Sequence, residues 1–229
     1  LSPALTSVIL NAMAIPQLPN RLLILLIGAI SVSIMLVLMM YLSHGFNKKS
    51  SIGVLATVIG IVLVAILARL FMSLINLDGA GSEEAFLLFS QTDGSIDLAQ
   101  VYFLSILVSA VGVLDDVIMS QISSVYEIYD TNKKLSTVRL YQKAMNIGRD
   151  HISSMVNTLF IAYAGSSLSL VMLLTYSRGG IGNILKTDVI AEEITRTIVP
   201  SLGILLIVPI ATFLAAYFVP LSEKRKSTG

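Results

Sequence analysis

The feature that most constrains this chain is an uncharged, mostly apolar run from Leu22 to Leu42. A helix needs about 20 apolar residues to cross the hydrocarbon core of a bilayer. Similar runs follow, and they place candidate spans at residues 22–42, 52–77, 98–126, 152–176 and 197–219. Backbone polar groups in lipid must pair within their own segment. We therefore expect residues 1–229 to form a single all-α transmembrane domain, a polytopic bundle of about five helices.

Composition supports a membrane protein and excludes several other classes. Of the 229 residues, 55% are hydrophobic and 13% are charged, whereas a soluble domain carries about 25% charged residues. A chain of this length cannot bury so much apolar surface in one water-soluble core. The composition excludes an ordinary soluble enzyme, a nucleic-acid-binding protein and a disordered chain. Cysteine is absent, which excludes disulfides and thiolate metal sites.

Two shorter segments accompany the expected spans. Residues 1–20 form an apolar, membrane-associated segment, of which 1–15 is short for a span. A re-entrant helix, an interfacial helix and the end of a span stay open as alternatives, and Leu1 in place of Met suits an incomplete or processed N-terminus. Residues 130–149 form a cytoplasmic loop in which apolar and basic side chains alternate with helical period, which predicts an amphipathic helix on the inner membrane surface.

The charges of the connecting segments predict the orientation. Basic residues fill the first and third connections and the tail: His44, Lys48 and Lys49, then Lys133, Lys134, Arg139, Lys143 and Arg149, then Lys224, Arg225 and Lys226. The second connection is acidic, with Asp78, Glu83, Glu84, Asp93 and Asp97. Short loops rich in Lys and Arg stay in the cytoplasm. We therefore expect a multi-pass membrane protein with its C-terminus in the cytoplasm.

Polar residues gather on two of the expected helices. Residues three or four apart share a helix face, and this spacing joins Gly112, Asp116, Ser120, Ser123 and Glu127 in one polar stripe beside Asp115. The helix that follows the amphipathic loop begins with a second polar set: Arg149, Asp150, His151, Ser154, Asn157 and Thr158. Both sets fall in the inner half of the membrane. We expect them to face each other, with Asp116 pointing into the bundle.

Carboxyl groups inside a bilayer indicate function. Placing one there costs about 2.5–3.5 kcal/mol on insertion scales. Acids that exchange protons beside a histidine and hydroxyl groups are what a proton relay or an ion site needs. The candidate proton- or ion-coupling residues are Asp115, Asp116, Ser120, Glu127, Arg149, Asp150, His151, Asn157 and Thr158. The alternative is that these groups pair across helices and hold the bundle together. Gly112 and Gly165 are candidates for close helix packing.

Several motifs resemble the YibE/F family of bacterial multi-spanning membrane proteins. They are Gly112-Val-Leu-Asp115-Asp116 followed by Tyr126-Glu127, Asn146-Ile-Gly148-Arg149-Asp150-His151-Ile, and Met155-Val-Asn157-Thr158-Leu-Phe-Ile-Ala-Tyr163-Ala-Gly165. The Gly45-Phe-Asn47-Lys-Lys-Ser stretch is also similar to the family. Longer relatives carry an extracellular domain after a first span. The resemblance therefore implies a shorter YibF-like subunit with a YibE-like membrane partner.

A fainter likeness, at the level of topology, is to the membrane half of SecF and of the resistance-nodulation-division transporters. Those proteins place Gly and Asp on a fourth membrane helix and follow it with an inner amphipathic segment and a polar fifth helix. The five expected spans would correspond to helices two to six of such a half. Topology of this kind is an analogy for function.

Three functions compete. The first is a permease-like membrane subunit of a transport or export complex, coupled to protons or ions through the inner acids. The second is a scaffold that binds a partner, or a homo-oligomer, and uses the polar stripe as interhelical glue. The third is an intramembrane hydrolase with a metal on Asp116, Asp150 and His151, but no tight ligand motif occurs. We expect a non-enzyme with no cofactor, no metal and no nucleic-acid partner; the substrate and the direction of transport stay open.

Overall fold

A computed structural model describes residues 30, 34, 37–38, 40–94, 96–169, 172 and 188–226. The expected N-terminal segment 1–20 and most of the expected span 22–42 lie outside these residues. Over the described part the chain is helical and contains no strand. The predicted all-α class is therefore confirmed.

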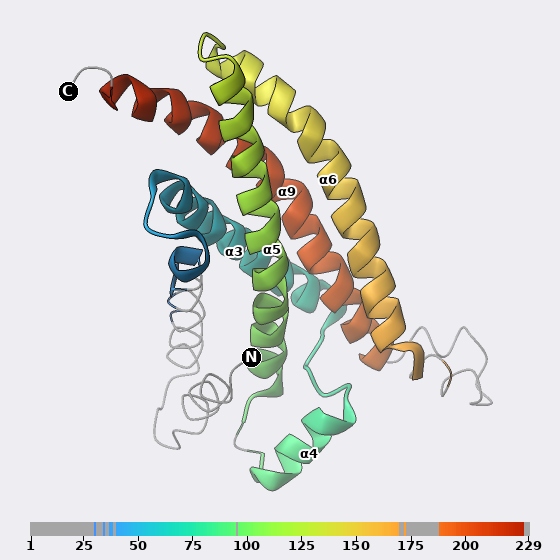
Figure 1. Ribbon diagram of the computed structural model, residues 1–229. Helices are drawn as coiled ribbons and strands as arrows, with labels where there is room; N and C mark the ends of the chain where they lie inside the picture. Colours follow the sequence, from blue (N-terminus) through green and yellow to red (C-terminus); the bar gives the residue numbers. More distant parts are fainter. Residues whose placement is uncertain are drawn as a thin grey trace.

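Five helices have defined bounds (Figure 1). They are α3 (Lys48–Ile75), α4 (Glu83–Gln91), α5 (Leu98–Thr131), α6 (Thr137–Ser166) and α9 (Asp188–Lys226). Three described helices are long and apolar enough to cross a membrane, namely α3, α5 and residues Asp188–Leu221 of α9. The total of five spans stays a prediction, because two of the expected spans run into undescribed residues.

Polar side chains cap the helix starts. The Asn47 side chain accepts from the Ser50 amide at 2.8 Å at the start of α3. Asp97 accepts from the Gln100 amide at 3.3 Å before α5, and Ser136 accepts from the Arg139 amide at 3.4 Å before α6. Such caps satisfy backbone donors that have no partner within the helix. They fix where each helix begins.

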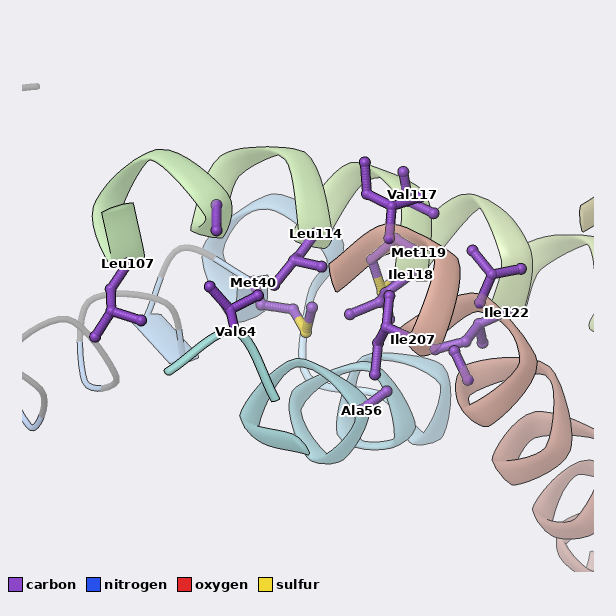
Figure 2. Packing of buried hydrophobic residues seen from close by; sticks show 14 of the residues in the cluster. Met40, Ala56, Val64, Leu107, Leu114, Val117, Ile118, Met119, Ile122 and Ile207 are labelled. Atoms are coloured by element: carbon purple, nitrogen blue, oxygen red, sulfur yellow. The ribbon is translucent and has the colours of Figure 1, made fainter. Parts of the chain in front are cut away.

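The core lies where α3, α5 and α9 meet. One cluster of buried side chains joins all three, with Val64 from α3, Leu114 and Ile118 from α5, and Ile204 and Ile207 from α9. Figure 2 shows such side chains gathered between the three ribbons. Burial of this interior leaves the opposite sides of the helices free to face lipid or a partner.

Glycines let the core helices approach closely. A Cβ atom added at Gly203 of α9 would lie 2.6 Å from Cγ2 of Val64 on α3. One added at Gly60 would lie 3.2 Å from Ile207 Cγ1 and 3.4 Å from Leu114 Cδ1. Small residues at helix crossings are a common device of membrane bundles, where close van der Waals packing drives association.

An apolar stripe on α3 faces away from the core. Every third or fourth residue is a large exposed hydrophobic side chain: Leu55, Val58, Val62, Ile66, Leu70 and Leu74. This spacing keeps them on one face of the helix. A continuous apolar face of this length is what a lipid-facing helix presents.

The α6 helix differs from the expected arrangement. It runs without a break from Thr137 to Ser166, so residues 137–149 of the expected amphipathic segment 130–149 and the first part of the expected span 152–176 form one helix. The helix packs along α9 and α5. Its first half is polar, which is why α6 is absent from the three helices apolar enough to span a membrane.

The α9 helix begins at Asp188, well before the expected start at residue 197. Pro200, Pro209 and Pro220 lie inside it. A proline removes one backbone hydrogen bond from a helix interior and favours a bend. Figure 1 shows α9 changing direction part-way along its length.

The described connections at the two ends of the bundle differ in charge. The starts of α3 and α6 and the ends of α5 and α9 gather at the upper end in Figure 1. These are the ends next to the basic connections. The acidic connection, with α4, lies at the lower end. The alternation of basic and acidic connections therefore matches two ends of one bundle.

Candidate functional site

The two adjacent acids of α5 lie close to its middle, and they have different surroundings. Asp115 is half-buried, and its Oδ1 is buried without a hydrogen-bond partner among the described residues. Asp116 is exposed. Successive residues of a helix are rotated by about 100°. Val111 and Met119, four residues before and after Asp115, contact α3 at Ile61 and Gly53. The rotation therefore turns Asp115 toward α3 and leaves Asp116 on the outer face.

The expectation that Asp116 points into the bundle is wrong for the described helices. The stripe that it belongs to lies on the outer side of α5: Gly112, Asp116 and Glu127 are exposed, and Ser120 is half-buried. The reason is on the opposite face of the helix. Leu114, Ile118 and Val125 of α5 fill the core between α3 and α9, and the stripe is turned away from them.

The polar set of α6 is also largely exposed. Arg149, Asp150, Asn157 and Thr158 are exposed. The Thr158 hydroxyl donates to its own helix, to the Ser154 carbonyl oxygen at 2.9 Å. His151 is half-buried, and its Nε2 is buried without a hydrogen-bond partner among the described residues. His151 is therefore the member of this set that turns toward the bundle.

The two polar sets do not form one site within the described chain. The packing of α6 on α5 runs through Gln121, Ala144 and Gly148, away from the outer stripe of α5. Among the described residues, no three His, Asp or Glu side chains are close enough to hold a metal ion. Asp116, Asp150 and His151 therefore do not assemble the metal site that the hydrolase hypothesis requires.

The two glycines expected at helix contacts lie on open faces. A Cβ atom at Gly112 or Gly165 would meet nothing within 4 Å in the part of the chain that the structure describes. Close contacts between helices occur instead at Gly53, Gly60, Gly148 and Gly203. A packing role for Gly112 and Gly165 toward another chain or toward undescribed residues stays a prediction.

The comparison with known families identifies the chain. The sequence profile of the family described as YibE/F-like protein matches residues 1–221, which include α3 to α6 and nearly all of α9. The chain belongs to this family. No curated protein matches the chain, and no solved structure matches it. Family membership and three membrane-capable helices make this YibE/F-like chain an integral membrane protein.

Sequence reasoning missed a buried polar link that joins three helices of this YibE/F-like bundle. Gln121 of α5 donates from Nε2 to the Ala144 carbonyl oxygen of α6 at 2.9 Å and to Thr212 Oγ1 of α9 at 2.8 Å. The Thr212 hydroxyl in turn donates to the Val208 carbonyl oxygen at 2.6 Å. Gln121 is one amide on the apolar face of a membrane helix. The sequence did contain a signal for this link, because Gln121 is a polar residue on the side of the helix opposite the polar stripe.

A second missed cluster lies at the acidic end of the bundle. Glu192 of α9 is buried, and its Oε1 accepts the Gly81 backbone amide at 3.0 Å. The Tyr102 hydroxyl donates to the Glu192 carbonyl oxygen at 2.6 Å. The Arg196 guanidinium lies 5.5 Å from the Tyr102 ring centroid. These contacts tie the connection before α4 to α5 and α9. In the sequence, Glu192 falls in the connection between the expected spans 152–176 and 197–219.

Proposed function

We propose that this protein is the membrane subunit of a transport or export complex that is coupled to protons or ions through the acids of α5. The single observation that supports this most is the pair Asp115 and Asp116 near the middle of a 34-residue helix. One carboxyl group turns toward α3 and the other faces outward. A carboxyl group inside the membrane costs free energy, and such groups usually mark ion pathways or proton relays.

The outward polar stripe supports a partner. Asp116 and Glu127 are exposed on α5, and no described helix supplies a partner for their carboxyl groups. Charged side chains in membrane helices usually face a bundle interior, a water-filled cavity or another chain. We propose that a YibE-like membrane subunit, or a second copy of this chain, covers the stripe in a bacterial cytoplasmic membrane, with the C-terminus in the cytoplasm.

The test of coupling is a paired measurement in cells. Strains lacking the gene receive the wild-type protein, Asp115→Asn, Asp116→Asn or the control Asp130→Asn, which changes an exposed acid at the end of the same helix. Asparagine keeps the size of the aspartate side chain and its ability to form hydrogen bonds, but it does not take up and release a proton as a carboxylate does. We expect Asp115→Asn, Asp116→Asn or both to fail to rescue the phenotype of the deletion strain, although the variant protein reaches the membrane at normal abundance. Asp130→Asn should rescue this phenotype. Full complementation by both Asp115→Asn and Asp116→Asn would overturn coupling through these acids.

The scaffold alternative has one observation in its favour. Gln121, Ala144 and Thr212 show that this chain uses a buried polar group to join helices. A stripe that acts as glue between subunits should tolerate asparagine, because its side chain still hydrogen-bonds. Gentle detergent purification separates the outcomes further. A retained membrane partner or a homo-oligomer supports an assembly, whereas a fully active monomer contradicts it.

A further inference from the structure

Thr57 carries a buried hydroxyl group on α3. Thr57 is 2% exposed, and its Oγ1 is buried without a partner among the described residues. Threonines inside helices commonly donate to a carbonyl oxygen one turn earlier, as Thr212 and Thr195 do in α9. Thr57 departs from this pattern. An unsatisfied buried polar group costs about 1–3 kcal/mol.

Two contacts place Thr57 opposite Asp115. On α3, Thr57 follows Gly53 by four residues and precedes Ile61 by four; on α5, Asp115 stands in the same way between Val111 and Met119. Residues four apart form a ridge along one helix face. A Cβ atom at Gly53 would lie 2.6 Å from Met119 Sδ, and Ile61 packs with Val111.

These contacts run in opposite directions along the two helices, so the ridges are antiparallel. The members at the middle of each ridge then lie at the same level of the interface. They are Thr57 and Asp115, and each has a buried oxygen without a hydrogen-bond partner among the described residues. One oxygen carries a hydrogen that it can donate, and the other belongs to a carboxyl group.

We infer that Thr57 and Asp115 form one proton-binding site between α3 and α5, linked through one water molecule. The inference rests on the proposed function in taking a proton as the ligand. A metal cation would need more oxygen ligands than these two side chains offer. A proton needs only the carboxyl group, with the Thr57 hydroxyl donating to a bridging water that in turn donates to the carbonyl oxygen of the acid. A buried water commonly makes 2–4 hydrogen bonds.

In the part of the chain that the structure describes, few charged groups lie around the site. His44, from the segment before α3, interacts electrostatically with Asp115, as does the neighbouring Asp116. Lys49 lies at the start of α3, before Thr57 in the chain, and its Nζ is 6.0 Å from the Tyr126 ring centroid. The α9 helix carries no charged residue between Pro200 and Ala216, and α6 meets α5 on another side, at Gln121. The site therefore lies between apolar contacts, with its charged neighbours in the segment before α3, at the start of α3 and on the outer face of α5.

Infrared spectroscopy of the purified full chain in lipid nanodiscs tests this site directly. A protonated carboxylic acid gives a C=O stretch distinct from that of a carboxylate. We expect such a band at neutral pH, its loss in Asp115→Asn, and its retention in Asp116→Asn. Thr57→Val should move the band to higher frequency, because the C=O group loses a hydrogen bond. Thr57→Ser, which keeps the hydroxyl, should restore its position.

The control is Thr158→Val, which changes an exposed threonine that bonds within its own helix and should leave the band in place. A band that is absent, that survives Asp115→Asn, or that ignores Thr57→Val in a folded protein overturns the inference. The readout requires no transport. If the band behaves as expected but Asp115→Asn and Asp116→Asn cells complement fully, the site stands and the proposed coupling fails. If either central change abolishes complementation but the band is absent, the coupling stands and this site fails.

Discussion

The side-chain amide of Gln121 lies 2.8 Å from Thr212 Oγ1, which joins α5 to α9 inside the bundle. The same amide nitrogen donates to the Ala144 carbonyl oxygen of α6. One side chain therefore links three helices, and two of those helices are membrane-capable. This contact lies on the far side of α5 from Asp116, so the polar chemistry that holds the bundle together is separate from the polar chemistry that we propose for coupling.

Replacing Gln121 with leucine should destabilise the bundle. Both donated hydrogen bonds are lost, and hydrogen bonds between membrane helices contribute about 0.6 kcal/mol each on average. We expect a loss of about 1–2 kcal/mol in the free energy of unfolding, since the Thr212 oxygen also loses a buried partner. Thermal unfolding in one detergent measures the change. Gln142→Leu, at an exposed position of α6, is the control, and equal melting temperatures for the two variants would contradict the role of Gln121.

Adding a methyl group at Gly203 should separate α3 from α9. The new Cβ would lie 2.6 Å from Val64 Cγ2, and overpacking a core typically costs about 1–3 kcal/mol. Gly203→Ala should therefore lower the melting temperature. Gly112→Ala is the matched control, because its Cβ meets nothing within 4 Å among the described residues and alanine favours helix by about 1 kcal/mol.

The same control reports on assembly. If another chain covers the outer stripe closely at Gly112, Gly112→Ala should leave the isolated subunit intact but reduce the amount of partner that copurifies with it. Undiminished copurification would place the partner elsewhere on the surface.

The long apolar helices could be predicted from sequence, but the inner face of α5 could not. Long, mostly apolar runs fix where α3, α5 and most of α9 lie, because lipid leaves the backbone no alternative to a helix. The spacing that unites Asp116 with Ser120 and Glu127 identifies a face, yet it does not state what the face contacts. Leu114 and Ile118 mark the buried side of α5, but apolar residues occur on both buried and lipid-facing sides of a membrane helix. Glu192 was missed because its partner, the Gly81 amide, is a backbone group more than a hundred residues away.

Labelling should reveal the orientation of the helices. The chain has no cysteine, so each introduced cysteine is the one reactive thiol. Glu84→Cys and Lys134→Cys change exposed residues at the acidic and basic ends and spare the capping residues Ser82 and Ser136. A membrane-impermeant maleimide should label position 84 in intact cells and position 134 only after permeabilisation. Labelling of both positions from outside would refute the predicted topology.

Removing the Glu192 carboxylate should release the connection before α4. Its Oε1 accepts the Gly81 amide at 3.0 Å, which fixes residues 78–82 against α9. In Glu192→Ala that amide loses its acceptor, so its hydrogen exchange should become faster, by about tenfold if the lost hydrogen bond is worth 1.4 kcal/mol. Glu192→Gln keeps an acceptor oxygen at the same place and should keep exchange slow, and Glu84→Ala, at an exposed residue of α4, should have no effect on residues 78–82. Hydrogen–deuterium exchange with mass spectrometry resolves this peptide. Equal protection in the Glu192→Ala and Glu192→Gln variants would mean that backbone packing, and not the carboxylate, holds the connection in place.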